Sequence, residues 1–320
     1  MALDPDIRIM LDRLAQEQAA QHDEVTLAGS RLSYRDQYRE MSRASEKPVT
    51  EEIIKLGTDR GDVSLHLYRP ADADGPLPVI LYLHGGGFVL GDAETYALQS
   101  ARIASECGAL VVFAEYRLAP EHPFPAAVED ALAAVDWVLA EAVRHGGDPA
   151  CFALMGDSAG ANLSIALMRH YRQQRLFRAV CLLYPLVDAR PYLGLAVPSG
   201  SDREFASGYY LEFAETEYFA KAYLPELAMA TDTRVSPVLA KDLGDLPPVL
   251  FYAAENDVLR DQGRAFAEQL KTAGNDVRYR CFDGLIHNFM QHAGISKASD
   301  AAFLEVCAAV RLALAGKGLR

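Results

Sequence analysis

The stretch Cys151–Leu163 decides the fold, because Gly156-Asp157-Ser158-Ala159-Gly160 joins an apolar, strand-like run to a helix-like run. A Gly-x-Ser-x-Gly turn between a strand and a helix is a nucleophile elbow, which leaves the serine hydroxyl standing above the edge of a sheet. The turn is too tight for side chains at its glycines, and the N–H of Ala159 lies at a helix N-terminus, where an oxyanion is favoured. The pattern therefore predicts Ser158 as a nucleophile.

On both sides of this turn, apolar runs alternate with helical patterns. Buried parallel strands are predicted at 78–83, 109–114, 151–155, 179–184 and 249–254. Helices are predicted at 94–106, 126–144, 159–173 and 261–273. A hairpin of 51–56 and 62–69 precedes this series, and a strand at 276–282 and a helix at 297–316 complete it. The alternation predicts an α/β fold with a mostly parallel, doubly wound sheet of eight strands.

Two parts of the chain fall outside this alternation. Helical patterns cover 5–20, where Asp4-Pro5 marks the start, and 33–46. About sixty residues rich in Tyr, Phe, Pro and Gly separate Tyr184 from Val249, and an insertion of this length in an α/β fold usually covers the site at the strands' carboxyl ends. Within it, 209–213 and 218–224 are expected to be helical and to wall an apolar pocket, although a spacer packed on the sheet is the alternative. The expected division is N-terminal cap helices at 1–46, a first core part at 47–188, an inserted cap segment at 189–246 and a second core part at 247–320.

Composition narrows the class of partner and compartment. The chain has 320 residues, half of them hydrophobic, and a net charge of −13, which argues against nucleic acid or an anionic membrane surface as a partner. No stretch reaches the roughly 18 apolar residues of a membrane span, and the acidic N-terminal residues lack the apolar run of a signal peptide. The five cysteines show no CxxC spacing, so reduced thiols in a cytoplasmic protein are expected.

A serine hydroxyl needs a base, and His287 is the best candidate. It follows the last predicted strand, and the chain order of nucleophile, acid and histidine agrees with an elbow of this kind. Five other histidines fit this role less well: His22, His66, His145, His170 and His292.

The imidazole in turn needs a carboxylate to orient it, and Asp257 lies in the loop after the strand at 249–254. Glu255, Asp261 and Asp283 are rivals by proximity. Asp261 is expected to cap the helix that follows, and Glu255 to belong to the strand end.

The loop His84-Gly85-Gly86-Gly87 follows a predicted strand. It lacks the Lys-Ser/Thr of a phosphate-binding loop and the spacing of a dinucleotide fingerprint. Glycines let backbone N–H groups approach a tetrahedral oxyanion closely, so Gly85 and Gly86 are predicted to donate together with Ala159. His84 is expected to anchor the loop by hydrogen bonds.

Three motifs together, His84–Phe88, Tyr116–Ala127 and Gly156–Gly160, resemble those of the bacterial hormone-sensitive-lipase-like esterases, family IV of the α/β-hydrolases. The resemblance covers nearly the whole chain, and it implies a capped α/β-hydrolase fold and a carboxylic ester hydrolase without metal or organic cofactor. It further implies a triad of Ser158, Asp257 and His287, and a small-molecule substrate with a short-to-medium acyl chain. The chain departs from the family's pattern at Val258, where proline is usual, and at Ala161, where a second glycine is usual.

Other interpretations remain open. The same triad could serve an amidase or peptidase, and parallel rates on an ester and its matching anilide would decide. The plant gibberellin receptor resembles the family but has lost the histidine, so His287 argues against a ligand receptor without catalysis. A homodimer is possible, because the strand at 276–282 could offer an edge for pairing.

Overall fold

Eight strands form one sheet in the computed structural model, which describes residues 2–20, 26–58 and 61–316. Their order is β1-β2-β4-β3-β5-β6-β7-β8. The pairs β1–β2 and β2–β4 are antiparallel, and the remaining pairs are parallel. The strands are β1 Val49–Thr58, β2 Gly61–Pro70, β3 Leu77–Leu83, β4 Leu110–Glu115, β5 Gly147–Asp157, β6 Phe177–Leu183, β7 Val249–Asn256 and β8 Val277–Ile286. The predicted fold, a mostly parallel doubly wound sheet of eight strands, is confirmed.

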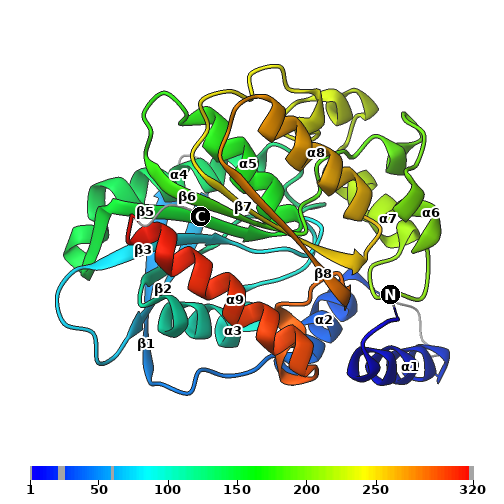
Figure 1. Cartoon of the computed structure of the whole chain (residues 1–320), viewed down its shortest axis with the longest axis horizontal. Coiled ribbons are helices and arrows are strands. Elements are labelled where there is room, and N and C mark those ends of the chain that lie inside the picture. The colour runs from blue at the N-terminus through cyan, green and yellow to red at the C-terminus, as the bar shows by residue number, and fades with distance from the viewer. Residues whose placement is uncertain (1, 21–25, 59–60, 317–320) are drawn as a thin grey trace.

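Helices cover both faces of the sheet (Figure 1). On one face lie α3 (Ala93–Cys107) and α9 (Lys297–Leu314), with α2 (Leu27–Met41) packed on α3. The opposite face carries α4 (Ala126–Glu141), α5 (Ala159–His170) and α8 (Arg260–Thr272). The helices α1 (Pro5–Ala20), α6 (Gly200–Glu204) and α7 (Phe213–Tyr223) gather at one end of the sheet, near the ends of β7 and β8 (Figure 1).

The core follows from the alternation of side chains along the strands. In β3, Val79, Leu81 and Leu83 belong to the apolar cluster that α4, α5 and α8 cover. Ile80 and Tyr82 of the same strand belong to the cluster beneath α3 and α9. Because both faces are covered, the central strands are apolar at nearly every position, which is typical of parallel strands in α/β folds.

The structure corrects two predicted helices. The second helix begins at Leu27 rather than 33, because the Thr26 side chain accepts the Gly29 N–H as an N-cap, and it ends at Met41 rather than 46. Residues 209–212 are not helical: Gly208 and Tyr210 have φ of 80° and 77°, a left-handed conformation that stops a helix. The helix α7 begins only at Phe213, after the reciprocal capping hydrogen bonds of Glu212 and Glu215.

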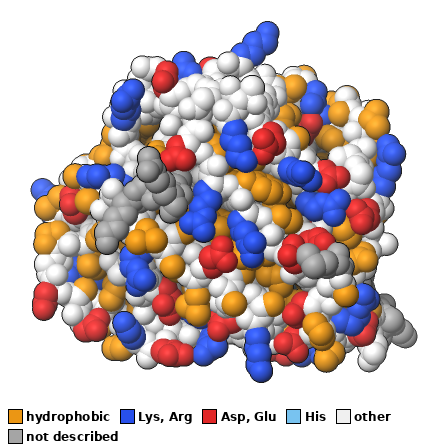
Figure 2. Space-filling model, in the orientation of Figure 1, with side chains coloured by type: hydrophobic (Ala, Val, Ile, Leu, Met, Phe, Trp, Pro, Cys, Tyr) orange, Lys and Arg blue, Asp and Glu red, His pale blue; other side chains and the backbone are white. Residues whose placement is uncertain are grey.

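Basic and acidic side chains are mixed over the face in Figure 2, so the negative net charge does not form one patch there. No helix in the described ranges is long and apolar enough to cross a membrane. His22 and two residues of the hairpin turn, 59 and 60, lie outside the described residues. The division into core and cap stays a prediction.

Candidate active site

Ser158 lies on a strained turn between β5 and α5. Its φ of 53° and ψ of −113° are unusual for a residue with a side chain. A Cβ at Gly156 would lie 2.5 Å from the Gly160 carbonyl oxygen, and a Cβ at Gly160 would lie 1.9 Å from the Leu83 carbonyl oxygen. Both positions therefore require glycine, as the sequence motif predicts.

Three side chains form one line of hydrogen bonds at the carboxyl ends of the strands. His287 Nε2 lies 3.0 Å from Ser158 Oγ. His287 Nδ1 lies 2.7 Å from Asp257 Oδ2, and Asp257 Oδ1 accepts the Leu259 N–H at 2.8 Å. All three side chains are buried. This geometry lets the imidazole take a proton from the hydroxyl while a fixed carboxylate orients the ring.

The rival carboxylates have other partners. Glu255 lies at the end of β7 and accepts the Gly284 N–H at 2.7 Å. Asp261 accepts the Ser201 N–H at 2.8 Å, so it binds the N-terminus of α6 rather than capping its own helix, which corrects the sequence prediction. Asp283 is exposed. Among the four candidates, Asp257 is the one that contacts the imidazole.

One of the predicted backbone donors of the oxyanion loop, Gly85, does not face the pocket. The Gly85 N–H donates to Asp157 Oδ1 at 3.0 Å and to Tyr96 Oη at 3.1 Å, so this predicted donor is occupied inside the protein. Gly86 and Gly87, together with Ala159, line the pocket above Ser158. The φ of Gly86 is 96°, and a Cβ there would meet the Leu90 carbonyl oxygen at 2.3 Å, so only glycine can turn the chain at this point.

His84 anchors this loop. Its Nδ1 lies 2.7 Å from the Gly85 carbonyl oxygen, and its ring stacks on Tyr116 at 4.2 Å between centroids. Burial lowers the pKa of His84 to about 4, which keeps the imidazole neutral. The Tyr116 hydroxyl also donates to the His84 carbonyl oxygen at 2.6 Å. The Tyr116 motif thus ties loops together beneath the site.

A buried carboxylate that sequence reasoning missed lies next to the nucleophile. Asp157 accepts hydrogen bonds from the Tyr82 hydroxyl at 2.7 Å and the Tyr96 hydroxyl at 3.1 Å, besides the Gly85 N–H. Burial raises the pKa of Asp157 to about 6, although these hydrogen bonds oppose the shift. The only sequence signal was its place before Ser158, because its partners come from distant segments.

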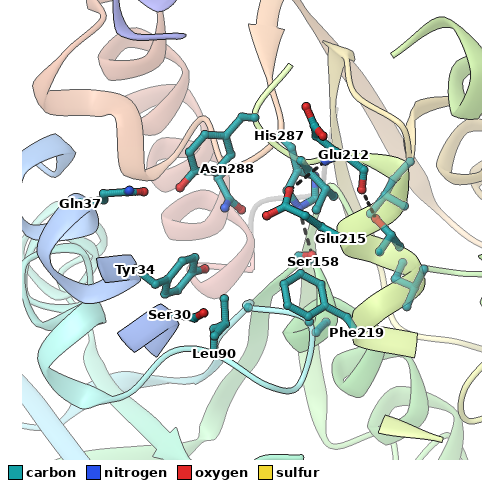
Figure 3. Close-up of a pocket in the computed structure, with 18 of the residues that line it drawn as sticks. Ser30, Tyr34, Gln37, Leu90, Ser158, Glu212, Glu215, Phe219, His287 and Asn288 are labelled. Atoms are coloured by element: carbon teal, nitrogen blue, oxygen red, sulfur yellow. Dashed lines mark hydrogen bonds between the residues drawn. The ribbon is translucent and has the colours of Figure 1, made fainter. Parts of the chain in front are cut away.

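A pocket of about 960 Å³ opens above Ser158 and His287 (Figure 3). Helix α7 contributes Phe219 and Glu215 to its lining, and α2 contributes Tyr34 and Gln37. The pocket is large enough for a small-molecule ligand. In the described part of the chain, no group of three or more His, Cys, Asp or Glu residues is arranged to hold a metal ion.

Known proteins share this sequence and this fold. A family model described as the alpha/beta hydrolase fold matches residues 80–291. The ethyl acetate hydrolase of Pseudomonas putida is 32% identical over 324 residues, covering 97% of this chain and 99% of that protein. Carboxylesterase NlhH of Mycobacterium tuberculosis is 35% identical over 260 residues, 79% of each chain. Among solved structures, the hyperthermophilic esterase of the archaeon Pyrobaculum calidifontis has a TM-score of 0.87 at 32% identity and covers 97% of this chain and 98% of its own.

Proposed function

Because the chain belongs to the hormone-sensitive-lipase-like (family IV) carboxylesterases of the α/β-hydrolase fold, we propose that Ser158, His287 and Asp257 carry out its ester hydrolysis. The chain is a carboxylic ester hydrolase. The observation that carries the assignment is the continuous line of hydrogen bonds from Asp257 through His287 to Ser158 at the floor of the pocket.

The reaction begins when an ester carbonyl docks over Ser158. Its oxygen points to the backbone N–H groups of Gly86, Gly87 and Ala159. As Ser158 Oγ attacks the carbonyl carbon, His287 Nε2 takes its proton, and the tetrahedral oxyanion is stabilised by these donors. The Ala159 N–H is suited to this because the first residue of a helix has no intrahelical acceptor.

The intermediate then collapses and the alcohol leaves with the proton from His287. Water activated by the same imidazole attacks the acyl-enzyme and releases the acid, and Asp257 stays ionised throughout. In this proposal Gly86 and Ala159 act as the donors predicted from the sequence, and Gly87 donates in place of Gly85.

The substrates we propose are esters with short-to-medium acyl chains. The pocket is bounded on the cap side by α7, where Phe219 and Tyr223 line it, and this limits the length of chain it accepts. The Pseudomonas putida relative is named for ethyl acetate, a short ester. A panel of p-nitrophenyl esters of increasing acyl length measures the preference, and the matching anilides test for amidase activity.

The deciding experiment is replacement of the nucleophile. Ser158→Ala is expected to lower kcat by roughly 10⁶-fold, as when such nucleophiles are deleted in other serine hydrolases, and to abolish labelling by a fluorophosphonate probe. Retention of labelling in this variant would refute the assignment, and a wild-type protein without labelling would favour the receptor alternative.

We also propose a cytoplasmic location and a homodimer. All five cysteines are free, which suits a reducing compartment. The strand β8 pairs with β7 along one edge only, and an open edge supports pairing between two copies.

A further inference from the structure

The pocket above Ser158 is lined by both apolar and polar side chains. Its apolar lining includes Leu90, Leu186, Phe219, Leu224 and Val235. Its polar lining comes from two sides: α2 contributes Ser30, Tyr34 and Gln37, whereas Glu212 and Glu215 lie at the start of α7, on the side of Phe219 (Figure 3). Asn288 also lines the pocket and, unlike these five, is buried, so its polar atoms cost free energy unless they find partners.

Asn288 is held in a conformation that points to a ligand. It follows His287 directly and has a φ of 64°, in the left-handed region. Its side chain is buried, with 5% exposed, and Nδ2 donates to the Tyr38 hydroxyl at 2.5 Å. Its Oδ1 is buried and has no hydrogen-bond partner in the described structure. Asparagine adopts this backbone conformation more readily than most residues, so the informative feature is the buried, unpaired Oδ1, which a donor on a substrate would satisfy.

Glu215 supplies a second acceptor above the nucleophile. Its Oε2 accepts the Glu212 N–H at 3.1 Å within the capping box of α7. No Lys or Arg of the described residues forms an ion pair with it. The Glu215 side chain keeps contact with solvent, and partial desolvation in the pocket, together with the nearby Glu212 carboxylate, raises the pKa of its carboxyl group. In Figure 3 the Glu215 carboxylate and the Asn288 carboxamide both project into the space over Ser158.

The charges around the pocket have one prevailing sign. In the described residues, its acidic lining side chains are Asp12, Glu17, Glu212 and Glu215. Arg8 is the basic one, and it lies on α1, which forms the outer part of the pocket. A pocket lined mainly by one sign of charge concentrates ligands of the opposite charge.

We propose that the enzyme prefers esters that carry a protonated amine, whose N–H donates to Asn288 Oδ1 and whose positive charge is attracted by the Glu215 carboxylate. This inference rests on the proposed function, since the ester must dock on Ser158. A protonated amine provides an N–H donor together with a positive charge, whereas a hydroxyl group provides a donor and no charge. Esters with a carboxylate at the same place are disfavoured, because they would face two acceptors and no donor.

Isosteric substrates test the proposal with the full-length enzyme at pH 7. On the alcohol arm, 2-(dimethylamino)ethyl acetate is compared with 3-methylbutyl acetate and 3-acetoxypropanoate. On the acyl arm, methyl 4-(dimethylamino)butanoate is compared with methyl 5-methylhexanoate. Each kcat/KM is divided by the rate constant for hydroxide hydrolysis of the same ester, which removes differences in intrinsic reactivity. On at least one arm, the ammonium ester is expected to exceed its neutral isostere by about tenfold, the effect of one charge-assisted hydrogen bond.

Two substitutions locate the preference. Glu215→Gln keeps an acceptor for the Glu212 N–H but removes the charge, and Asn288→Gly keeps the left-handed backbone but removes the carboxamide. Each is expected to lower the ammonium-to-neutral ratio by about tenfold. Glu217→Gln is the matched control, because Glu217 lies on the same helix and pairs with Lys221 outside the pocket; it should leave the ratio unchanged.

The outcomes distinguish failure of the substrate preference from failure of the proposed function. The ratio does not depend on the fraction of folded enzyme, because both esters are measured on one preparation. A wild-type ratio near one on both arms, or a ratio that both substitutions leave intact, overturns the preference while hydrolysis of the neutral ester upholds the proposed function. Absence of hydrolysis of every ester, with no labelling of Ser158, overturns the proposed function itself.

Discussion

At the scale of single residues, Asp157 links the two backbone segments that meet at the site. It ends β5 just before the nucleophile, and it accepts the Gly85 N–H from the loop after β3. The hydroxyls of Tyr82 and Tyr96 hold it from below. A buried network of this kind is rigid only while all its members are paired, so the protonation state of Asp157 bears on stability.

The pH dependence of stability reports on Asp157. Burial raises its pKa to about 6 in the folded protein, above the value near 3.9 of an unfolded chain. The native state therefore binds the extra proton between these values, and this contribution to stability is present below pH 4 and is lost as pH rises through 6. Relative to Asp157→Asn, the free energy of unfolding of the wild type should fall by about 2 kcal/mol between pH 4.5 and 7.5. Urea unfolding of both proteins across this range measures it, and parallel curves would contradict it.

The acid of the triad is tested by a pair of amide substitutions. Asp257→Asn is expected to lower kcat by about 10⁴-fold, because the imidazole is then held in the wrong tautomer. Glu255→Gln is the control, since Glu255 contacts the Gly284 N–H rather than the imidazole. Rates on a p-nitrophenyl ester measure both. Full activity of the Asp257 variant would move the acid to another carboxylate.

Sequence reasoning reached some site residues and not others for physical reasons. Ser158 and His287 could be predicted because a tight turn and a fixed chain order constrain them locally. Which glycine of the oxyanion loop presents its N–H to the pocket depends on the φ of Gly86 and on the distant Asp157, and neither can be inferred from the motif. Asn288 could not be predicted from the sequence, because its proposed role depends on the pocket that surrounds it.

At the scale of elements, the parallel strands and their helices were predicted to within a few residues, because hydrophobic periodicity and glycine turns are local. The helix predicted at 209–213 is wrong over 209–212, because the backbone has positive φ at Gly208 and Tyr210, which aromatic content does not reveal. Tertiary packing decides the conformation of such segments, and a single sequence does not report it.

The close packing of the elbow gives a prediction about stability. In Gly160→Ala the new Cβ would lie 1.9 Å from the Leu83 carbonyl oxygen, so backbone must move and the cost should exceed the ~3 kcal/mol of ordinary overpacking. Gly274→Ala is the contrast: its φ is 89°, but no atom lies within 4 Å of the added Cβ, so only backbone strain of about 1–2 kcal/mol is expected. Urea denaturation compares the two, and equal losses would contradict the steric argument.

At the scale of the whole molecule, the sheet has one edge formed by β1 and another formed by β8. Along β8, Arg278 and Arg280 lie 4.0 and 3.8 Å from Glu305 of α9. These ion pairs are exposed and add little stability. No further strand of the described residues pairs with the outer edge of β8, although the Asp4 N–H donates to the Gly284 carbonyl oxygen near the end of this strand. The rest of the edge is what strand pairing between copies would use.

The dimer that we propose pairs β8 of two copies across a two-fold axis, so that each strand contacts the same strand of its partner. Light scattering after size exclusion should give a mass near 70 kDa, twice the 35.0 kDa of one chain. Because successive N–H groups of a strand point to opposite edges, one of Tyr279→Pro and Arg280→Pro removes a donor to β7 and the other removes a donor at the outer edge. The variant that loses the outer donor, whichever of the two it is, should remain folded and become monomeric, because proline is tolerated where the N–H faces outward. If both proline variants fold and remain dimeric, the interface lies elsewhere. A mass of 35.0 kDa for the wild type at micromolar concentration would exclude the dimer.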